Sequence, residues 1–245
     1  MDNLNIVLPM AGKGQRFKDK GIYDPKPLID VAGIPMVKRA AMSLSFFDKI
    51  KPSNIICIVR NDDVKKFDIK RKLRQIFGNG IHVLVDQNPI GAATTVLVAK
   101  SLINNTNQLI VMDCDVSFHS SEYESKILMN DRNTDGLIPV FPCEGNKWSF
   151  SEFGSDKKIK TIAEKKRISN YANIGFYYFS NGYDFIENTE RLLNKKVTAF
   201  GEYYISLVMN EMIQNGKSIY AAIADNFKNM GTPDDLNIFL ENLNR

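Results

Sequence analysis

Short apolar runs alternate with helical patterns through the first half of the chain. The runs that predict strands, each bounded by polar or turn residues, are Leu4–Leu8, Asn54–Val59, Ile81–Val85 and Leu109–Met112. The helices predicted between them begin at Pro35 and cover Asp62–Phe77 and Ala92–Leu102. This alternation is typical of βαβ units, so the sequence predicts an α/β fold with a mainly parallel sheet.

The pattern changes from Asp135 onward, where shorter strands are separated by polar turns. These strands are predicted at Gly136–Phe141, Trp148–Phe153, Lys158–Ala163 and Asn173–Phe179. Helices are predicted to begin at Gly201 and at Pro233, the latter capped by Thr232. We therefore expect a small mixed or antiparallel extension of the sheet, within a single domain over residues 1–245 that has two halves, 1–134 and 135–245.

Composition places the chain among ordinary globular proteins. Hydrophobic residues make up 44% and charged residues 24%, and no apolar run approaches the length of a membrane span. The net charge of +4 is spread along the chain, which argues against nucleic-acid binding. The three cysteines have no metal-ligand spacing, and no secretory signal is evident. We expect a reduced, cytoplasmic protein with no membrane partner, and the sequence leaves its oligomeric state open.

The first predicted strand runs into Leu-Pro-Met-Ala-Gly-Lys-Gly-Gln-Arg-Phe, and Pro-Lys-Pro-Leu follows shortly afterwards. Gly12 and Gly14 let the backbone turn and approach a ligand closely, and successive N–H groups in such a turn bind anions. Lys13, Arg16 and Lys26 add three cations. Because Gly14 follows Lys13, this is not a Walker motif. The composition of the loop suits a triphosphate.

Two carboxylates, Asp113 and Asp115, leave the apolar strand at Leu109–Met112 together. They would repel each other without a cation, and Mg²⁺ needs only one or two protein carboxylates. This pattern predicts a magnesium site. Alternatively, one Asp caps the segment that starts near Ser117, or the pair binds a nucleotide-sugar, as in glycosyltransferases of related fold.

The Gly-rich pattern together with Pro-Lys-Pro-Leu-Ile resembles the nucleotidyltransferases that make nucleotide sugars. The resemblance implies a Rossmann-like, three-layer α/β/α fold of the glycosyltransferase A type. It also implies a Mg²⁺-dependent reaction in which a nucleoside triphosphate and a phosphorylated acceptor yield pyrophosphate. Residues 1–134 would then be the nucleotide-binding half and residues 135–245 the acceptor-binding half.

The same resemblance assigns roles to individual residues. The implied nucleotide-binding residues are Met10, Ala11, Gly12, Gly14, Gln87, Gly91, Ala92 and Asp113. The implied catalytic cations are Lys13, Arg16 and Lys26. The implied metal ligands are Asp115 and Asn229, the latter standing where the family commonly has Asp. The implied acceptor-binding residues are Trp148, Glu164, Lys165, Asn173 and Glu202.

Each of these assignments has a plain structural alternative. Gly91 at a helix start would allow close approach of a base. Alternatively, Gln87 and Gly91 form a polar turn with a helix cap. Glu202 also fits the first turn of a helix, where the dipole favours an acid. Trp148 is either a core anchor or a wall of the acceptor pocket.

Within this family the chain resembles the small capsule-locus cytidylyltransferases that join CTP to phosphoglutamine. A sugar 1-phosphate or phosphocholine acceptor stays open, as does a glycosyltransferase. A catalytically inactive nucleotide-binding module is a further alternative, because Asn229 adds no negative charge to the metal site. An ionised acceptor phosphate needs no general base, so positioning and charge neutralisation would carry the reaction.

Overall fold

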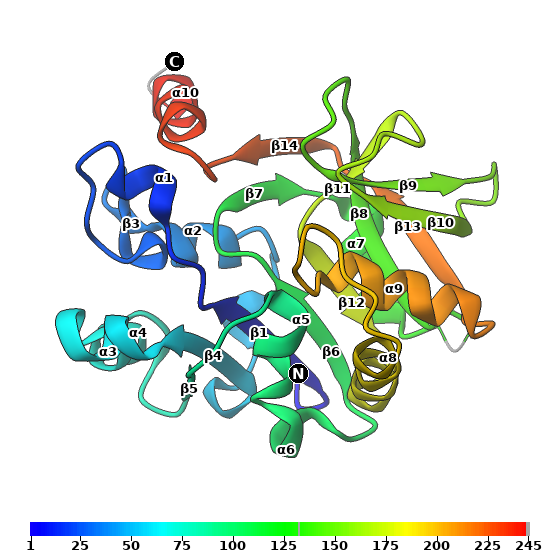
Figure 1. The fold of residues 1–245 in the computed structure, drawn as a ribbon, viewed down its shortest axis with the longest axis horizontal. Helices are drawn as coiled ribbons and strands as arrows, with labels where there is room; N and C mark the ends of the chain where they lie inside the picture. The colour runs from blue at the N-terminus through cyan, green and yellow to red at the C-terminus, as the bar shows by residue number, and fades with distance from the viewer. Residues whose placement is uncertain (132, 244–245) are drawn as a thin grey trace.

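A computed structural model describes residues 1–131 and 133–243 of the chain. A sheet in the order β10-β9-β11-β8-β12-β6-β1-β4-β5, with β13 paired to β8, runs through the molecule (Figure 1). Its parallel half consists of β1 (Leu4–Met10), β4 (Ile55–Arg60), β5 (His82–Asp86) and β6 (Gln108–Met112). The strand predictions of the first half of the chain are therefore confirmed.

The mixed extension continues the same sheet beyond β6. Its strands are β12 (Phe176–Phe179), β8 (Gly136–Pro142), β13 (Ile219–Ile223), β11 (Tyr171–Asn173), β9 (Ser149–Phe153) and β10 (Ile159–Glu164). The strand β12 runs antiparallel to β6 and β8, whereas β13 runs parallel to β8. The predicted extension is thus present, but the expectation that it is small is wrong, because in the described residues it has six strands and the parallel half has four.

Helices cover both faces of the sheet because side chains alternate along each strand. On β1, Ile6 and Leu8 belong to one buried cluster and Val7 to the other. The first cluster packs under α2 (Met36–Ala41), α4 (Ile69–Phe77) and α7 (Ser121–Met129). The second packs under α5 (Ala92–Leu97), α6 (Lys100–Ile103), α8 (Gly182–Asn194) and α9 (Ile205–Gln214). The predicted three-layer arrangement is confirmed.

A third apolar cluster joins the beginning of the chain to its end. Phe17 of α1 (Gln15–Lys18) packs in it with Met230 and with Phe239 of α10 (Pro233–Leu243). The short elements nearby are η1 (Lys26–Leu28), β2 (Asp30–Val31), β3 (Ile34–Pro35), and β7 (Val116–His119) paired with β14 (Asn226–Asn229). This packing holds the segment after β14 next to the Gly-rich loop (Figure 1).

Several predicted element boundaries are wrong. The helix predicted over residues 62–77 is interrupted by Asp68, whose φ of 50° ends α3 (Asn61–Phe67) before α4 begins. The helix predicted over residues 92–102 divides into α5 and α6, and the strand predicted over residues 173–179 divides at Gly175. The helix predicted at Gly201 begins only at Ile205, after Tyr204.

The remaining elements are η2 (Phe47–Lys49) and η3 (Pro52–Asn54). No helix among residues 1–131 and 133–243 is long and apolar enough to cross a membrane.

Candidate active site

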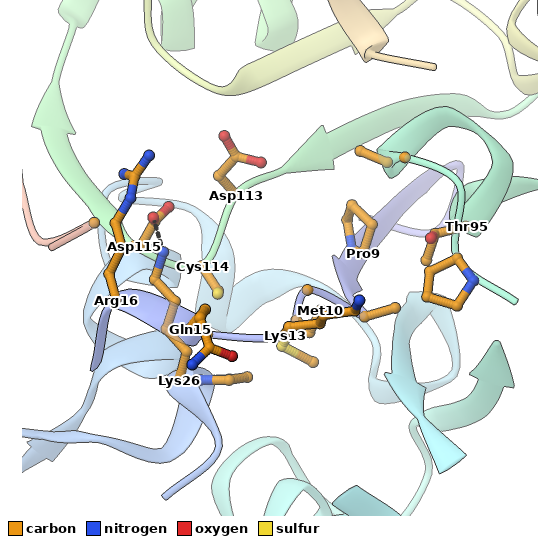
Figure 2. A pocket seen from close by; sticks show the side chains of 18 of the residues that line it. Pro9, Met10, Lys13, Gln15, Arg16, Lys26, Thr95, Asp113, Cys114 and Asp115 are labelled. Carbon is orange, nitrogen blue, oxygen red and sulfur yellow. Dashed lines mark hydrogen bonds and ion pairs between the residues drawn. The ribbon is translucent and has the colours of Figure 1, made fainter. Parts of the chain in front are cut away.

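A cavity of about 660 Å³ opens at the carboxyl ends of β1 and β6 (Figure 2). The strand β1 pairs with β4 on one side and with β6 on the other, so the strand order reverses at this point. Open α/β sheets bind ligands at such a reversal because the loops on either side diverge and leave a crevice. The Gly-rich loop and the segment Asp113–Asp115 both line this crevice.

The Gly-rich loop offers open backbone and unpaired cations. A side chain at Gly12 would meet no atom within 4 Å, and Gly14 has a φ of 64° that favours glycine. Lys13 and Arg16 both line the cavity. Neither makes an ion pair with any residue in the described ranges. Both are therefore available for an anion that reaches the loop.

Lys26 and Asp115 form an ion pair inside the cavity (Figure 2). Pro25 precedes the turn η1, which begins at Lys26. The Lys26 Nζ lies over the Phe17 ring, 5.8 Å from the ring centroid. Burial disfavours the charge of Lys26, but Asp115 outweighs that effect and raises the lysine pKa above its usual value. Lys26 is therefore a firmly protonated cation at the end of β6.

Asp113 lies two residues before Asp115 and opens onto the cavity. Asp113 is exposed to the cavity, and its partial enclosure by the surrounding protein, reinforced by the charge of Asp115, raises its pKa to about 7. The positive charge of Lys26 lowers the pKa of Asp113 in part. The two aspartates thus differ, because Asp115 forms an ion pair with Lys26 whereas the Asp113 side chain is exposed to the cavity.

Gly175 fixes the position of Asp113, a role that the sequence analysis did not find. The Asp113 backbone N–H donates to the Gly175 carbonyl at 2.7 Å. A Cβ on Gly175 would lie 2.5 Å from Asp113 Cγ and closer still to Oδ2. A lone glycine in a strand-like run can mark such a close approach, and this was the available signal.

Cys114 lies between the two aspartates but is not a nucleophile. Burial, with the charge of Asp115 as the next cause, raises the pKa of its thiol to about 12. At neutral pH it is a protonated thiol, and the reactive form of cysteine is the thiolate. The raised pKa therefore argues against a nucleophilic role for Cys114.

The donor set of the cavity suits a hard cation with few protein ligands. A Cβ on Gly231 would lie 2.9 Å from Asp115 Oδ2 and 3.0 Å from Asn229 Oδ1, so both oxygens lie close to one point beside the cavity. The Asn229 Nδ2 donates to Asp235 Oδ2 at 2.6 Å, and its Oδ1 accepts from the Gly231 N–H at 3.0 Å. No group of three His, Cys, Asp or Glu side chains converges in the described part of the chain. Mg²⁺ fits this set, since it takes further oxygens from phosphates and water.

The predicted base-contacting residues are distributed over two adjacent cavities. Gly91 and Ala92 line the main cavity, as do Met10 and Ala11. Gln87 lines a neighbouring cavity of about 450 Å³, which shares Lys13 with the first.

The close approach at Gly91 has a different cause from the predicted one. A Cβ on Gly91 would lie 2.5 Å from the Tyr203 nitrogen and 2.6 Å from its oxygen, and the residue has a φ of 125°. The backbone of Tyr203 therefore requires the glycine, and the residue needs no base to explain it.

Two of the predicted acceptor-binding residues lie at or near the cavity. Glu202 lines it, within a bridge to Ala199 that precedes α9, so the expected first-turn position is wrong. Glu164 is half-buried, accepts a hydrogen bond from Ser206 Oγ at 2.6 Å, and has a pKa raised chiefly by burial.

The other predicted acceptor-binding residues are engaged by the protein and are absent from the cavity lining. Asn173 is buried, with its amide oxygen held by Ser151 and its nitrogen by Ser149, both at 2.6 Å. Trp148 packs against the rings of Phe141 and Phe227. The exposed Lys165 donates a hydrogen bond to Tyr204 at 2.9 Å.

Comparison with known proteins identifies relatives of this chain. Residues 5–243 match the family described as nucleotidyl transferase. The bifunctional protein GlmU of Methanococcus vannielii is 26% identical over 255 residues, which is 98% of this chain and 56% of that protein. Its counterpart in Methanococcus maripaludis is 26% identical over 243 residues, 95% of this chain and 53% of that protein. The chain spans about half the length of the curated relatives it matches.

Solved structures share the fold over almost the entire chain. A nucleoside-diphosphate-sugar pyrophosphorylase from Vibrio cholerae superposes with a TM-score of 0.82 and 25% identity, covering 96% of this chain and 99% of that one. The inositol-1-phosphate CTP transferase from T. maritima has a TM-score of 0.73 and 16% identity, covering 98% and 94%. These superpositions confirm the Rossmann-like fold.

Proposed function

The chain belongs to the nucleotidyl transferase family, and on that premise we propose that it joins a nucleoside triphosphate to a small phosphorylated acceptor and releases pyrophosphate. One observation carries the proposal. Lys13 and Arg16, the Lys26–Asp115 pair and Asp113 converge on one cavity at the reversal of the strand order. Such a set of cations around open backbone suits a triphosphate held next to a second anion.

The residues of the cavity would carry the reaction by positioning and charge neutralisation. An acceptor phosphate oxygen forms the new bond to the α-phosphorus as the bond to the bridging oxygen of the β-phosphate breaks. Lys13 and Arg16 would stabilise the charge that leaves with pyrophosphate, and Lys26 would neutralise the approaching anions. Asp115 and Asn229 would hold Mg²⁺, which supplies additional positive charge to the phosphates when bound.

No general base is required because a phosphate monoester is largely ionised at neutral pH. The described residues of the cavity lining include no histidine, which agrees with this mechanism.

We propose CTP and phosphoglutamine as the substrate pair, in capsular polysaccharide modification, on the resemblance to small capsule-locus cytidylyltransferases. The fold shared with an inositol-1-phosphate CTP transferase is compatible with CTP. A sugar 1-phosphate is the first alternative acceptor, since other proteins of this fold are named as a glucose-1-phosphate thymidylyltransferase and a UDP-glucose pyrophosphorylase. Phosphocholine is the second alternative.

A glycosyltransferase would use Asp113 and Asp115 but would leave the cations of the Gly-rich loop without a role. An inactive nucleotide-binding module was suggested by Asn229, yet its amide oxygen lies close to the same point as Asp115 Oδ2. The geometry therefore favours an active transferase over both alternatives.

The test is pyrophosphate release with Mg²⁺, using CTP, UTP, ATP, GTP and dTTP against phosphoglutamine, glucose 1-phosphate, inositol 1-phosphate and phosphocholine. We expect release with CTP and phosphoglutamine alone. Release with another pair would retain the reaction and replace the substrates. Turnover of a nucleotide-sugar without consumption of any triphosphate would establish the glycosyltransferase. A triphosphate that raises the melting temperature (Tm) without pyrophosphate release would establish the inactive module.

A further inference from the structure

Lys165 and Phe200 have neighbouring side chains, and the backbone of each residue is in a left-handed conformation. Their φ angles are 50° and 51°, a region that bulky residues rarely adopt. Phe200 is also 72% exposed, so burial in the core does not explain it. An unfavourable conformation on a large exposed aromatic residue is the kind of outlier that points to a function.

The aromatic residues surround the lysine ammonium. Lys165 Nζ lies 4.7 Å from the centroid of the Phe200 ring and 5.0 Å from that of Tyr204, within the range of a cation–π interaction. It also donates a hydrogen bond to the Tyr204 hydroxyl at 2.9 Å. An ammonium has three N–H donors, and the Tyr204 hydroxyl accepts from only one of them.

The loop that carries these rings is fixed to the main cavity. Its Tyr203 donates to the Ile90 carbonyl at 3.0 Å and accepts from the Ala93 N–H at 2.9 Å. Glu202, on the same loop, lines the cavity. Backbone hydrogen bonds therefore hold this loop beside the cavity, although Lys165 itself is not among the residues that line it. A lysine on an exposed turn would otherwise sample many rotamers, and the two rings restrict it.

We propose that Phe200 and Tyr204 are positioning residues that hold the Lys165 ammonium where it meets the phosphate of the acceptor. This inference rests on the proposed function, because the inference places the acceptor phosphate next to Lys165. The rings do not touch the reacting atoms, and their effect passes through the lysine. The proposal accounts for an aromatic ring that is largely exposed and lies against the lysine ammonium.

The kinetic test compares Phe200→Ala, Phe200→Tyr and Tyr204→Phe with a matched control, Tyr183→Ala, which removes a 54% exposed aromatic side chain from α8. With the acceptor of the panel above that turns over fastest, we expect Phe200→Ala to raise the acceptor KM about fivefold, with the triphosphate KM unchanged. Phe200→Tyr keeps a ring and should restore the wild-type KM, whereas Tyr204→Phe should fall between the two. An unchanged acceptor KM in Phe200→Ala would overturn the proposal.

A second measurement needs no substrate. Reductive ¹³C-methylation labels lysine side chains and retains their charge. The NMR signal that disappears in Lys165→Arg belongs to Lys165, and its shift should carry the ring current of the two aromatic side chains. We expect Phe200→Ala to move that signal and Tyr183→Ala to leave it in place. A signal that does not move in Phe200→Ala would overturn the proposal even if the enzyme turns over.

The two measurements separate this proposal from the proposed function. If no triphosphate and acceptor release pyrophosphate, the proposed function fails and the role toward the acceptor fails with it, although the NMR shift still reports whether the rings hold the lysine. If pyrophosphate is released and the NMR signal does not move, the proposed function stands and only the positioning role is wrong.

Discussion

Gly175→Ala is the change whose consequence follows most directly from the structure. The new Cβ would lie 2.5 Å from Asp113 Cγ and 3.0 Å from Asp113 Cβ, so the aspartate must leave its rotamer or β12 must move away from it. Forcing extra volume into a packed position costs about 1–3 kcal/mol. In a chain of this size that corresponds to a decrease of about 2–12 °C in Tm.

The effect on activity should exceed the effect on stability. Asp113 opens onto the proposed triphosphate site, and a displacement of about 1 Å can slow an enzyme about 100-fold. We therefore expect Gly175→Ala to lower kcat/KM by about two orders of magnitude. Steady-state pyrophosphate release and differential scanning fluorimetry would measure the two effects separately.

A matched control and a double mutant make the reasoning refutable. Gly145→Ala adds a Cβ whose nearest neighbour is Cys143 Sγ at 3.9 Å, an ordinary contact, and it should behave as wild type. Because the clash involves the Asp113 carboxyl group, Gly175→Ala should cost less stability in an Asp113→Ala background than in the wild type. Wild-type kcat/KM in Gly175→Ala, or an equal loss of stability in the two backgrounds, would refute the steric account.

Four further substitutions test the remaining parts of the site. Lys26→Ala and Asp115→Ala should each abolish pyrophosphate release with little change in the far-ultraviolet circular dichroism spectrum, and wild-type rates would remove the residue from the mechanism. Asn229→Asp places a second carboxylate against Asp235, which now accepts from Asn229 at 2.6 Å, so Tm should fall without Mg²⁺ and rise further on adding it than in wild type. An unchanged Mg²⁺ effect on Tm would contradict this. Burial raises the pKa of Glu164, so the folded state holds that proton more tightly and stability falls as pH rises above 4.5. Glu164→Gln should therefore gain Tm over wild type with increasing pH, and parallel pH profiles would show that the carboxyl is not desolvated.

The local sequence predicted the strands correctly where local interactions decide the structure. The apolar runs predicted β1, β4, β5 and β6 because a strand covered by helices on both faces must be apolar on both. The positions of the Gly-rich loop and of Asp113 followed from the same runs, since both come directly after a strand. Parallel strands end at one edge of a sheet, and the structure brings both segments to one cavity there.

The element boundaries failed where a single residue breaks the backbone pattern. Asp68 adopts a left-handed conformation in the middle of a helical periodicity, and Gly175 interrupts a strand-like run to admit Asp113. Periodicity averages over many residues, so it does not register a break at one position.

The sequence by itself determined the class of fold, the place of the site and the chemistry of its cations and carboxylates, because these depend on periodicity and on residues close together in the chain. Only the tertiary structure decided which partner each polar side chain has. Asn173 is held by serines more than twenty positions away, and Lys165 by rings more than thirty positions away. Such partners are set by how distant segments pack, and the free energy of that packing leaves no local pattern in the chain.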